Sequence, residues 1–446
     1  MSRIKSVIKR NGAIVPFNPD RITNAIYRAA VSVGGRDRAV AEGLSLKVIQ
    51  MLEKTIPEGK SPTVEQIQDI VEKVLIENKH ARVSKAYILY RADRARSRMQ
   101  AVESSSTPAH NIPWAKIWHV LDWATEFQVN TVCGFNARVT NGELIQVTEE
   151  SEAAYAEDIR NAANMIVERK DTVRIVFITG PSSSGKTTST IKVGKHLKKH
   201  GMQLVTLNVD NYFFDLDKHP KDEFGDYDFE TPQALDLELI NEHLVKLTKG
   251  EEVMLPIYDF KSGHRLDERI PMKLNKGDLI LIDSLHGLYP AMTKDLPEEQ
   301  KFKLYLEPLL QMKDQDGNYI RWTDIRLMRR MLRDAAFRAY DPEQTLLHWH
   351  YVRSSEMRNI VPFHHTANYI INSAMPYELS IYKPKLENRF AGWVDKYAED
   401  PLRADAFERA VRCYSLLQKL TPLEDDSFVP KDSVIREFIG GSILKY

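Results

Sequence analysis

The feature that most constrains the fold of this chain is the run Gly180-Pro-Ser-Ser-Ser-Gly-Lys-Thr187. It fits the pattern GxxxxGK[ST] in full. The apolar run at 173–179 predicts a buried strand before it, and the sequence at 189–199 predicts a helix after it. A strand, a glycine loop and a helix in this order are the context of a phosphate-binding loop. The alternative is a Ser/Gly-rich turn that binds no ligand.

In such a loop, backbone N–H groups at the helix N-terminus surround the phosphates, and the helix dipole favours their negative charge. Lys186 is expected to reach the outer phosphates, and the Thr187 hydroxyl to bind Mg²⁺. ATP and Mg²⁺ are therefore the expected cofactors. The residues expected to bind the nucleotide in this loop are Gly180, Ser183, Ser184, Gly185, Lys186, Thr187 and Thr188.

The size and charge of the chain exclude several classes of protein. Its 446 residues suffice for about two or three domains. The 62 Lys and Arg residues balance 62 Asp and Glu residues, which argues against a nucleic-acid partner. No apolar run reaches the roughly 18 residues of a membrane span, and the N-terminal residues lack the apolar core of a signal peptide. Two cysteines make no disulfide framework, so we expect a cytoplasmic protein.

Residues 1–97 are predicted to form a small, mostly helical domain with a β-hairpin. Asn11-Gly12 lies between two short apolar runs, which is the strongest local signal for a hairpin. Asn18-Pro19 predicts the start of a helix, because Asn caps helices and Pro favours their first position. Thr63 and Gln66 have the spacing of a capping box. A further helix is expected from about residue 81 to 96.

Residues 98–150 are predicted to be a linker or connecting segment, since Ser104-Ser-Ser-Thr-Pro108 is the best linker candidate. Helices are expected at 114–124 and 153–169. From residue 173, strands and helices alternate, which predicts an α/β fold with a doubly wound parallel sheet. This domain would span residues 151–385, with a helical extension over residues 386–446. The expected strands are 174–179, 203–209, 279–283, 303–307 and 368–372.

Two of these strands end in a carboxylate. Asp210 closes the second expected strand and Asp283 the third. In a parallel sheet, the carboxyl ends of the strands line the ligand crevice. Asp210 could accept the proton of an attacking hydroxyl or hold Mg²⁺, and Asp283 is the expected second acidic ligand of that ion. Each aspartate could instead be a cap at the end of a strand.

The segment 326–338 is rich in arginine. On a helix, the side chains at 326, 330 and 333, or at 329 and 333, share a face. Arginine clusters stabilise the charge of a phosphoryl group during its transfer, so Arg330 and Arg333 are candidate catalytic residues. A solvated basic helix is the alternative.

Residues from about 150 to 446 resemble the uridine kinase and phosphoribulokinase group of P-loop kinases, most closely its bacterial branch of longer uridine-kinase-like proteins. The matching runs keep the family order from residue 180 to residue 442. Besides the phosphate-binding loop, these runs are Val209-Asp-Asn-Tyr-Phe213, Pro220-Lys-Asp-Glu-Phe-Gly-Asp-Tyr-Asp-Phe-Glu230 with Ala234-Leu-Asp236, Pro256-Ile-Tyr-Asp-Phe260 with Arg265, Ile282-Asp-Ser-Leu-His-Gly-Leu288, Thr323-Asp-Ile-Arg-Leu-Met-Arg-Arg330, Asn372-Ser-Ala-Met-Pro-Tyr-Glu378 and Arg436-Glu-Phe-Ile-Gly-Gly-Ser442.

The resemblance implies further roles. Asp210 would be the general base on a ribose-type 5′-hydroxyl, or a partner of Mg²⁺. A mobile lid over the phosphates would carry Arg329, Arg330, Arg333 and Arg338, with Arg329 and Arg338 on the nucleotide. The acceptor pocket would be lined by Asp210, Tyr212, Asp236, Tyr258 and Arg265. Asp236 suits vicinal hydroxyls, because a carboxylate can accept two hydrogen bonds from a diol.

Three positions depart from the family pattern. Asp283-Ser284 stands where the family usually has Glu-Gly, and the shorter side chain could contact a metal through water. Gly263 stands where nucleoside kinases have a base-recognising His, with His264 one place later. An Arg-Gly-Arg of the lid becomes Arg338-Ala-Tyr340, which removes one positive charge.

Residues 3 to about 97 resemble the ATP-cone, a regulatory nucleotide-binding module best known from ribonucleotide reductases. The matching runs are Val7-Ile-Lys-Arg-Asn-Gly12, Pro16-Phe17, Arg21-Ile22, Thr63-Val-Glu-Gln-Ile67 and Tyr87-Ile-Leu-Tyr-Arg91. The resemblance implies a regulatory nucleotide, ATP or dATP, held by Val7, Lys9, Arg10 and Arg21. Solvated hairpin residues, or a cone with only an assembly role, are the alternatives.

These resemblances imply an ATP-dependent kinase for a small molecule, with a nucleoside 5′-hydroxyl as the first choice of acceptor and the cone as its regulator. A sugar phosphate is a second choice, for which Lys261 and His264 could supply positive charge. A nucleotide-sensing protein that transfers nothing to a small acceptor is the alternative outside enzymes. Both resembled families usually assemble, so a homo-oligomer is expected.

Overall fold

The computed structural model describes residues 3–8, 14–31, 33–35, 37–57, 59–89, 91, 112–220, 230–260, 262–275, 277–337, 340–400 and 403–445. These residues divide into two compact units, one before and one after the boundary near residue 110, and each unit is described by itself. Within these ranges, no helix combines the length and the apolar character that crossing a membrane requires.

The first unit is a β-hairpin with helices. Strands β1 (Ser6–Ile8) and β2 (Ile14–Pro16) pair antiparallel, as the Asn-Gly signal predicted. Helix α1 (Asp20–Val31) follows Asn18, whose side chain accepts a hydrogen bond from the Asp20 amide at 2.8 Å. Helix α2 (Arg38–Thr55) and helix α3 (Val64–Glu77) follow, and α3 begins with the predicted capping box. The further helix is present at 81–89, and most of its expected last turns lie outside the described residues.

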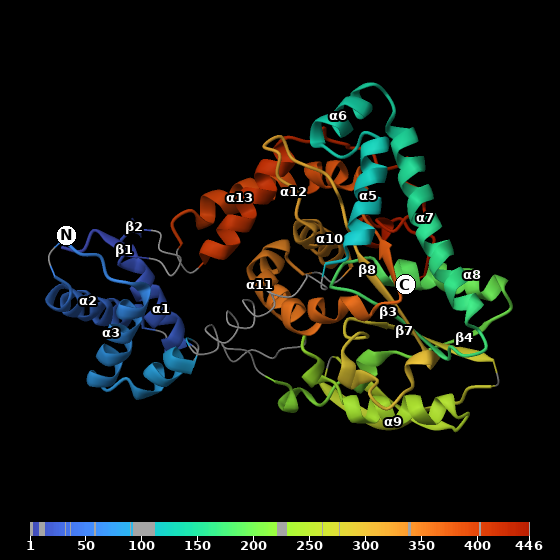
Figure 1. Cartoon of the computed structure of the whole chain (residues 1–446), viewed down its shortest axis with the longest axis horizontal. Helices are drawn as coiled ribbons and strands as arrows, with labels where there is room; N and C mark the ends of the chain where they lie inside the picture. The colour runs from blue at the N-terminus through green and yellow to red at the C-terminus, as the bar shows by residue number, and fades with distance from the viewer. Residues whose placement is uncertain are drawn as a thin grey trace. The chain divides into compact units, whose positions relative to one another are not determined.

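The second unit is built on a five-stranded sheet in the order β4-β7-β3-β8-β9, of which Figure 1 labels β4, β7, β3 and β8. All neighbouring strands in it are parallel. The five predicted strands are all present, as β3 (Ile175–Thr179), β4 (Gln203–Thr206), β7 (Asp278–Ser284), β8 (Lys301–Glu307) and β9 (Tyr369–Asn372). Strand β4 ends three residues early, because the chain turns into the 3-10 helix η1 (Val209–Tyr212), which Asn208 caps.

Both faces of the sheet are covered, so the predicted doubly wound fold is confirmed. Successive β3 side chains alternate between two hydrophobic clusters: Val176 and Ile178 join one, and Ile175 and Phe177 join the other. The first cluster includes side chains of α7 (Leu144–Glu168), α8 (Lys186–Lys199), α10 (Trp322–Phe337), α11 (Pro342–Asn359), α12 (Glu378–Tyr397) and α13 (Ala404–Gln418). The second includes α9 (Leu237–Thr248) and the antiparallel hairpin β5 (Val253–Asp259) and β6 (His264–Met272), which the sequence analysis did not anticipate.

The segment expected to be a linker differs from that expectation after residue 111. Helix α5 (Trp114–Glu126), helix α6 (Val132–Thr140) and the start of α7 fold with the second unit. Val132, Phe135 and Val147 are fully buried in its main core. Helix α7 also runs without a break through the expected boundary at residue 150, and α12 runs through the one at 385. Apolar residues in these short helices, rather than a composition shift, decide where the unit begins.

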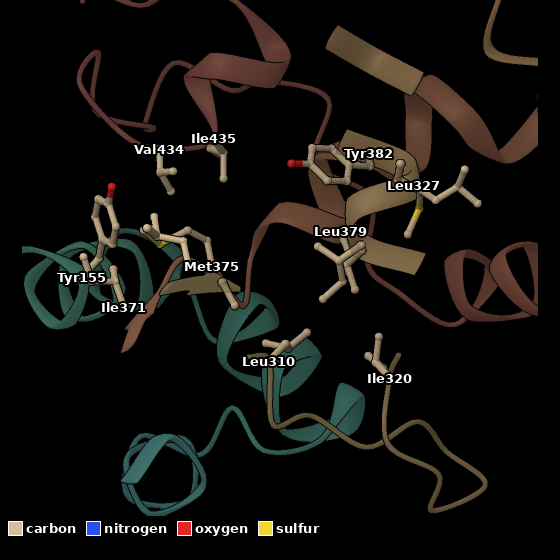
Figure 2. Packing of buried hydrophobic residues seen from close by; sticks show 14 of the residues in the cluster. Tyr155, Leu310, Ile320, Leu327, Ile371, Met375, Leu379, Tyr382, Val434 and Ile435 are labelled. Atoms are coloured by element: carbon tan, nitrogen blue, oxygen red, sulfur yellow. The ribbon is translucent and has the colours of Figure 1, made fainter. Parts of the chain in front are cut away.

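The C-terminal segment belongs to the same core. Figure 2 shows Val434 and Ile435 near Tyr155 of α7 and Met375. Directly after them comes the short helix α14 (Arg436–Ile439), which packs on α10. Residues 434 and 435 are therefore part of the core that also holds the sheet.

Candidate active site

The glycine run forms a tight loop between β3 and α8 at the carboxyl edge of the sheet. Gly180 has a φ of +156°, and a Cβ there would lie 2.3 Å from the Leu306 carbonyl oxygen. Gly185 has a φ of +87°, and a Cβ there would lie 2.5 Å from a Val434 methyl group. Ser183 has a φ of +60°, which non-glycine residues adopt mainly where the surroundings enforce it. The loop thus needs glycine where the pattern has it.

The carbonyl oxygens of the loop are engaged from the protein side. The Lys186 ammonium donates to the first two carbonyls of the loop, at 3.0 and 3.2 Å. The carbonyls of the three serines accept from Arg326 at 3.1 Å, from Arg329 at 3.5 Å and from the Ser373 hydroxyl at 2.6 Å. In a trans peptide the N–H points away from the C=O, so the contacts of the serine carbonyls turn the amides that follow them away from these partners. The Ser184 amide itself donates within the loop, to the Pro181 carbonyl at 3.3 Å.

Two hydroxyls of the loop have unused hydrogen-bonding capacity. The side-chain oxygens of Ser183 and Ser184 are buried and have no hydrogen-bond partner among the described residues. Such groups are costly unless a ligand or water satisfies them. Together with the half-buried Lys186 and the N-terminus of a long helix, they suit an anion of several oxygens, such as a chain of phosphates.

Asp283 and Thr187 meet next to this loop. The Thr187 hydroxyl donates to an Asp283 carboxylate oxygen at 3.4 Å, because the register of β7 with β3 places Asp283 beside Ile178. Burial raises the pKa of Asp283 to about 6, and the nearby Lys186 charge opposes this rise. Burial likewise lowers the pKa of Lys186, while the Asp283 charge opposes that shift. A hydroxyl and a carboxylate are hard oxygen donors that fit Mg²⁺, which uses one or two carboxylates together with phosphates.

Helix α10 supplies two kinds of arginine. Arg326 and Arg329 are fully buried beneath the loop, paired with Glu356 and Glu378. Arg329 therefore supports the loop from below, and the expectation that it belongs to a lid over the nucleotide is wrong. Its guanidinium is committed to Glu378, Ser373 and Ser183.

Arg330 and Arg333 lie on the more open side of α10. Arg330 donates to the Ser182 hydroxyl at 3.2 Å and pairs with Glu230 at 3.0 Å, so the structure brings it to the loop. Arg333 pairs with Asp334 at 3.0 Å. Arg338 lies outside the described residues.

The residues expected to line the acceptor pocket are only partly brought together. Asp236 and Arg265 form an ion pair of 2.9 Å, and Asp236 also caps α9 by accepting from the Leu239 amide at 3.0 Å. Asp210 is exposed in η1, four residues beyond the end of β4, and its charge reaches Asp283, whose pKa it helps to raise. Asp283 therefore lies near the end of its strand as predicted, Asp210 lies just beyond its strand in η1, and Asp236 is held at the start of α9.

Two tyrosines are more enclosed than expected. Tyr212 is fully buried and its hydroxyl is hydrogen-bonded to His243 at 2.9 Å, so its side chain does not line a pocket and that expectation is wrong. Tyr258 is 5% exposed and packs against Phe213 and Phe260. Apolar partners on α9 and β5, distant in sequence, explain the burial of Tyr212.

Three polar residues at the loop had no predicted role. His286 is buried beside Lys186, and burial together with that charge lowers the pKa of His286 to about 3, which keeps it neutral. Glu378 is the buried partner of Arg329. Glu437, on α14, accepts hydrogen bonds from Thr188. Glu378 and Glu437 lie in runs that match the kinase family, and this match was the only available signal.

The residues expected to bind a regulatory nucleotide can be placed only in part. Arg21 is exposed in the first turn of α1, and Val7 is 8% exposed in β1. Lys9 and Arg10 lie outside the described residues.

Comparison with known proteins assigns both units to families. Residues 5–96 match the ATP cone domain, and residues 175–379 match the phosphoribulokinase / uridine kinase family. The uridine kinase of Bacillus pumilus is 31% identical over 160 residues, which are 36% of this chain and 67% of that protein. The chain belongs to the phosphoribulokinase/uridine kinase family.

Other relatives match this chain over a smaller share of their own length. Uridine-cytidine kinase B of Dictyostelium discoideum is 31% identical over 172 residues, 39% of this chain and 63% of that protein. The vitamin B12-dependent ribonucleoside-diphosphate reductase of Thermoplasma acidophilum is 44% identical over 96 residues, 20% of this chain and 12% of that protein. The first unit is thus an ATP-cone domain, and the second carries the phosphoribulokinase/uridine kinase domain.

Proposed function

We propose that the protein is a cytoplasmic kinase that transfers the γ-phosphate of ATP to the 5′-hydroxyl of a nucleoside. The observation that carries this proposal is the meeting of Lys186, Thr187 and Asp283 at a loop in which two hydroxyls have no partner among the residues that the structure describes. Family membership supports phosphoryl transfer, because the relatives named above include two kinases that act on nucleosides.

Each group at the site has a proposed task. Lys186 would hold the outer phosphates, and Arg330 and Arg333 would stabilise the charge of the phosphoryl group in transfer. Thr187 and Asp283 would hold Mg²⁺, which neutralises phosphate charge when bound. Asp210 would accept the proton of the attacking hydroxyl, for which its exposed position at the sheet edge is suited.

Asp236 and Arg265 are the proposed contacts of the ribose. One Asp236 oxygen caps α9, and the other pairs with Arg265. A carboxylate has about four lone-pair sites, so it can still accept hydrogen bonds from a vicinal diol. The shared contacts would hold this carboxylate in one orientation.

We further propose that a nucleotide at the ATP-cone regulates the kinase and that the protein forms homo-oligomers. The motivation is the presence of two nucleotide-binding families in one chain. Regulation of this kind requires that the cone ligand binds two states of the protein with different affinity. Removal of residues 1–100 should therefore change the nucleotide response of the kinase, its assembly, or both.

The deciding experiment is ATP consumption with a panel of ribonucleosides, deoxyribonucleosides and pentose phosphates, with the products identified by mass spectrometry. Lys186→Ala should abolish turnover. Lys199→Ala is the matched control, because Lys199 is exposed at the far end of the same helix. A nucleoside monophosphate that forms with the unchanged protein and the control, but not with Lys186→Ala, would support the proposal.

Other outcomes identify the alternatives. Phosphorylation of a sugar phosphate but of no nucleoside would point to the second acceptor class, with His264 beside Asp215 as a source of positive charge. Binding of ATP without any product across the panel would point to a nucleotide sensor.

A further inference from the structure

Glu437 brings a negative charge to the N-terminus of the phosphate-loop helix. One of its carboxylate oxygens accepts hydrogen bonds from both the amide and the hydroxyl of Thr188, at 3.1 and 2.8 Å. Glu437 is 8% exposed, and Thr188 is fully buried. Hydrogen bonds to an ionised carboxylate are stronger than those between neutral groups. We call this pair of bonds the Glu437–Thr188 contact.

The donors in this contact are ones that a nucleotide would use. Thr188 is the third residue of α8, and the first N–H groups of a helix have no partner within the helix. In loops of this pattern those N–H groups surround the inner phosphates of the nucleotide. A carboxylate and a phosphate are both anions, so they compete for the same position at the helix end.

The segment that carries Glu437 is firmly seated. Arg436 donates to Asp426 at 2.9 Å and to the Val429 carbonyl at 2.9 Å. Val434 packs directly on Gly185 of the loop, and Figure 2 shows it in the core together with Tyr155. The position of Glu437 is therefore set by the fold.

The charge of Glu437 already acts on the nucleotide site. It favours the protonated form of Lys186 and contributes to the raised pKa of Asp283. A phosphate that entered beside Thr188 with Glu437 in place would bring two like charges together in a buried site, which is unfavourable. Binding of the phosphate therefore requires that the carboxylate leaves.

We propose that Glu437 is an internal competitor of the nucleotide: it holds the Thr188 donors in the empty protein, and a bound nucleotide displaces it and loosens α14. This inference rests on the proposed function only in assigning nucleotide binding to the loop. Apparent affinity falls in proportion to the fraction of molecules that are competent to bind. The Glu437–Thr188 contact therefore weakens nucleotide binding and links the C-terminal segment to the state of the site.

The test compares Glu437→Gln, which keeps the size of the side chain but removes its charge, with the unchanged protein. Glu424→Gln is the matched control, since Glu424 is an exposed acid that precedes the same C-terminal segment. The affinities of ADP, AMP and adenosine are measured by calorimetry on the full chain. The same titrations in chains that also carry Lys186→Ala identify the binding that belongs to the ATP-cone.

We expect Glu437→Gln to bind ADP and AMP at least about 10-fold more tightly, since hydrogen bonds to charged groups contribute at least this much. Adenosine, which has no phosphate, should bind with unchanged affinity, and the control should match the unchanged protein. An equal or weaker affinity for ADP, or an equal gain for adenosine, would overturn the inference. Such results would mean that Glu437 only maintains the shape of the loop.

Hydrogen exchange on the unchanged protein provides a second test that needs no variant. Amides of residues 436–440 should exchange faster once ADP is bound, and equal or slower exchange would contradict displacement. The two proposals fail differently. Absence of any Lys186-dependent nucleotide binding would reject the proposed function, whereas such binding without a gain in Glu437→Gln rejects only the internal competitor.

Discussion

The ion pair between Arg329 and Glu378 beneath the phosphate loop allows a sharp test of how the site is supported. Both side chains are 0% exposed, and they are joined by two hydrogen bonds of 2.7 and 2.9 Å. Glu378 also accepts from the Met375 amide at 3.0 Å and from the Tyr382 hydroxyl at 2.9 Å. Glu378→Gln keeps the shape of the side chain and removes its charge, which leaves a buried guanidinium without its counter-ion.

Removal of one partner of a buried pair typically costs about 3 to 5 kcal/mol. We expect a loss near the lower end, about 3 kcal/mol, because the Glu437 charge also stabilises the charged form of Arg329. Urea unfolding followed by tryptophan fluorescence measures this loss. All six tryptophans lie at residue 114 or later, so the signal reports only on the second unit.

The matched control is Glu242→Gln. Glu242 pairs with Lys246 at 2.6 Å, but the two side chains are 54% and 43% exposed. An exposed pair contributes about 0 to 1 kcal/mol, so this variant should unfold almost like the unchanged protein. A loss below about 1 kcal/mol for Glu378→Gln, or equal losses in the two variants, would refute the reasoning from burial.

Three further predictions concern the loop, its acid and the acceptor contacts. Gly180→Ala should lower the free energy of unfolding in urea by about 3 kcal/mol and abolish Lys186-dependent ATP binding, because its Cβ would overlap the Leu306 carbonyl. The control Gly201→Ala, at a left-handed position with open space around it, should lower the free energy of unfolding by only about 1 to 2 kcal/mol. Similar losses in the two variants would show that the overlap with Leu306 is not the cause. Burial raises the pKa of Asp283 in the folded protein to about 6, from an ordinary value of 3.8. The contribution of its protonated carboxyl to the free energy of unfolding is therefore fully present below pH 3.8 and is lost as the pH rises through 6. Between these pH values the nucleotide-free protein should lose about 3 kcal/mol relative to Asp283→Asn, and parallel pH profiles would exclude this effect. Asp236→Asn should keep the helix cap but raise the KM for the acceptor at least about 10-fold at unchanged ATP affinity, and an unchanged KM would remove Asp236 from the acceptor site.

The local patterns in the sequence predicted the parts of the fold that depend on neighbours in the chain. The glycine loop, the strands that end near Asp210 and Asp283, and the capping box at Thr63 are each fixed by a few adjacent residues. In each case the residues of the pattern are themselves the physical cause of the local structure: a glycine in a left-handed conformation, an apolar run that is buried as a strand, or a side chain that caps a helix.

The parts that the sequence did not reveal depend on contacts between distant segments. In the sequence, Arg329 is one of several basic residues on a helix, and only the folded chain shows that it forms a buried ion pair with Glu378. Tyr212 was predicted to line the acceptor pocket, and only the folded chain shows that its hydroxyl is hydrogen-bonded to His243 on α9. The helix at 114–124 was predicted and is present as α5, but α6, which is only nine residues long, was missed, as was the membership of both helices in the second unit.

The Glu437–Thr188 contact also has a consequence for the synthesis of the protein, because its partners are 249 residues apart in the chain. Translation proceeds at about 5 to 20 residues per second, so roughly 12 to 50 s separate the two residues on the ribosome. During this interval the sheet lacks Val434 and Ile435, which complete its core. The ATP-cone, whose core lies entirely within its own contiguous segment, can fold long before. The nascent chain therefore passes through a stage in which the cone can be folded while the core of the kinase domain is still incomplete.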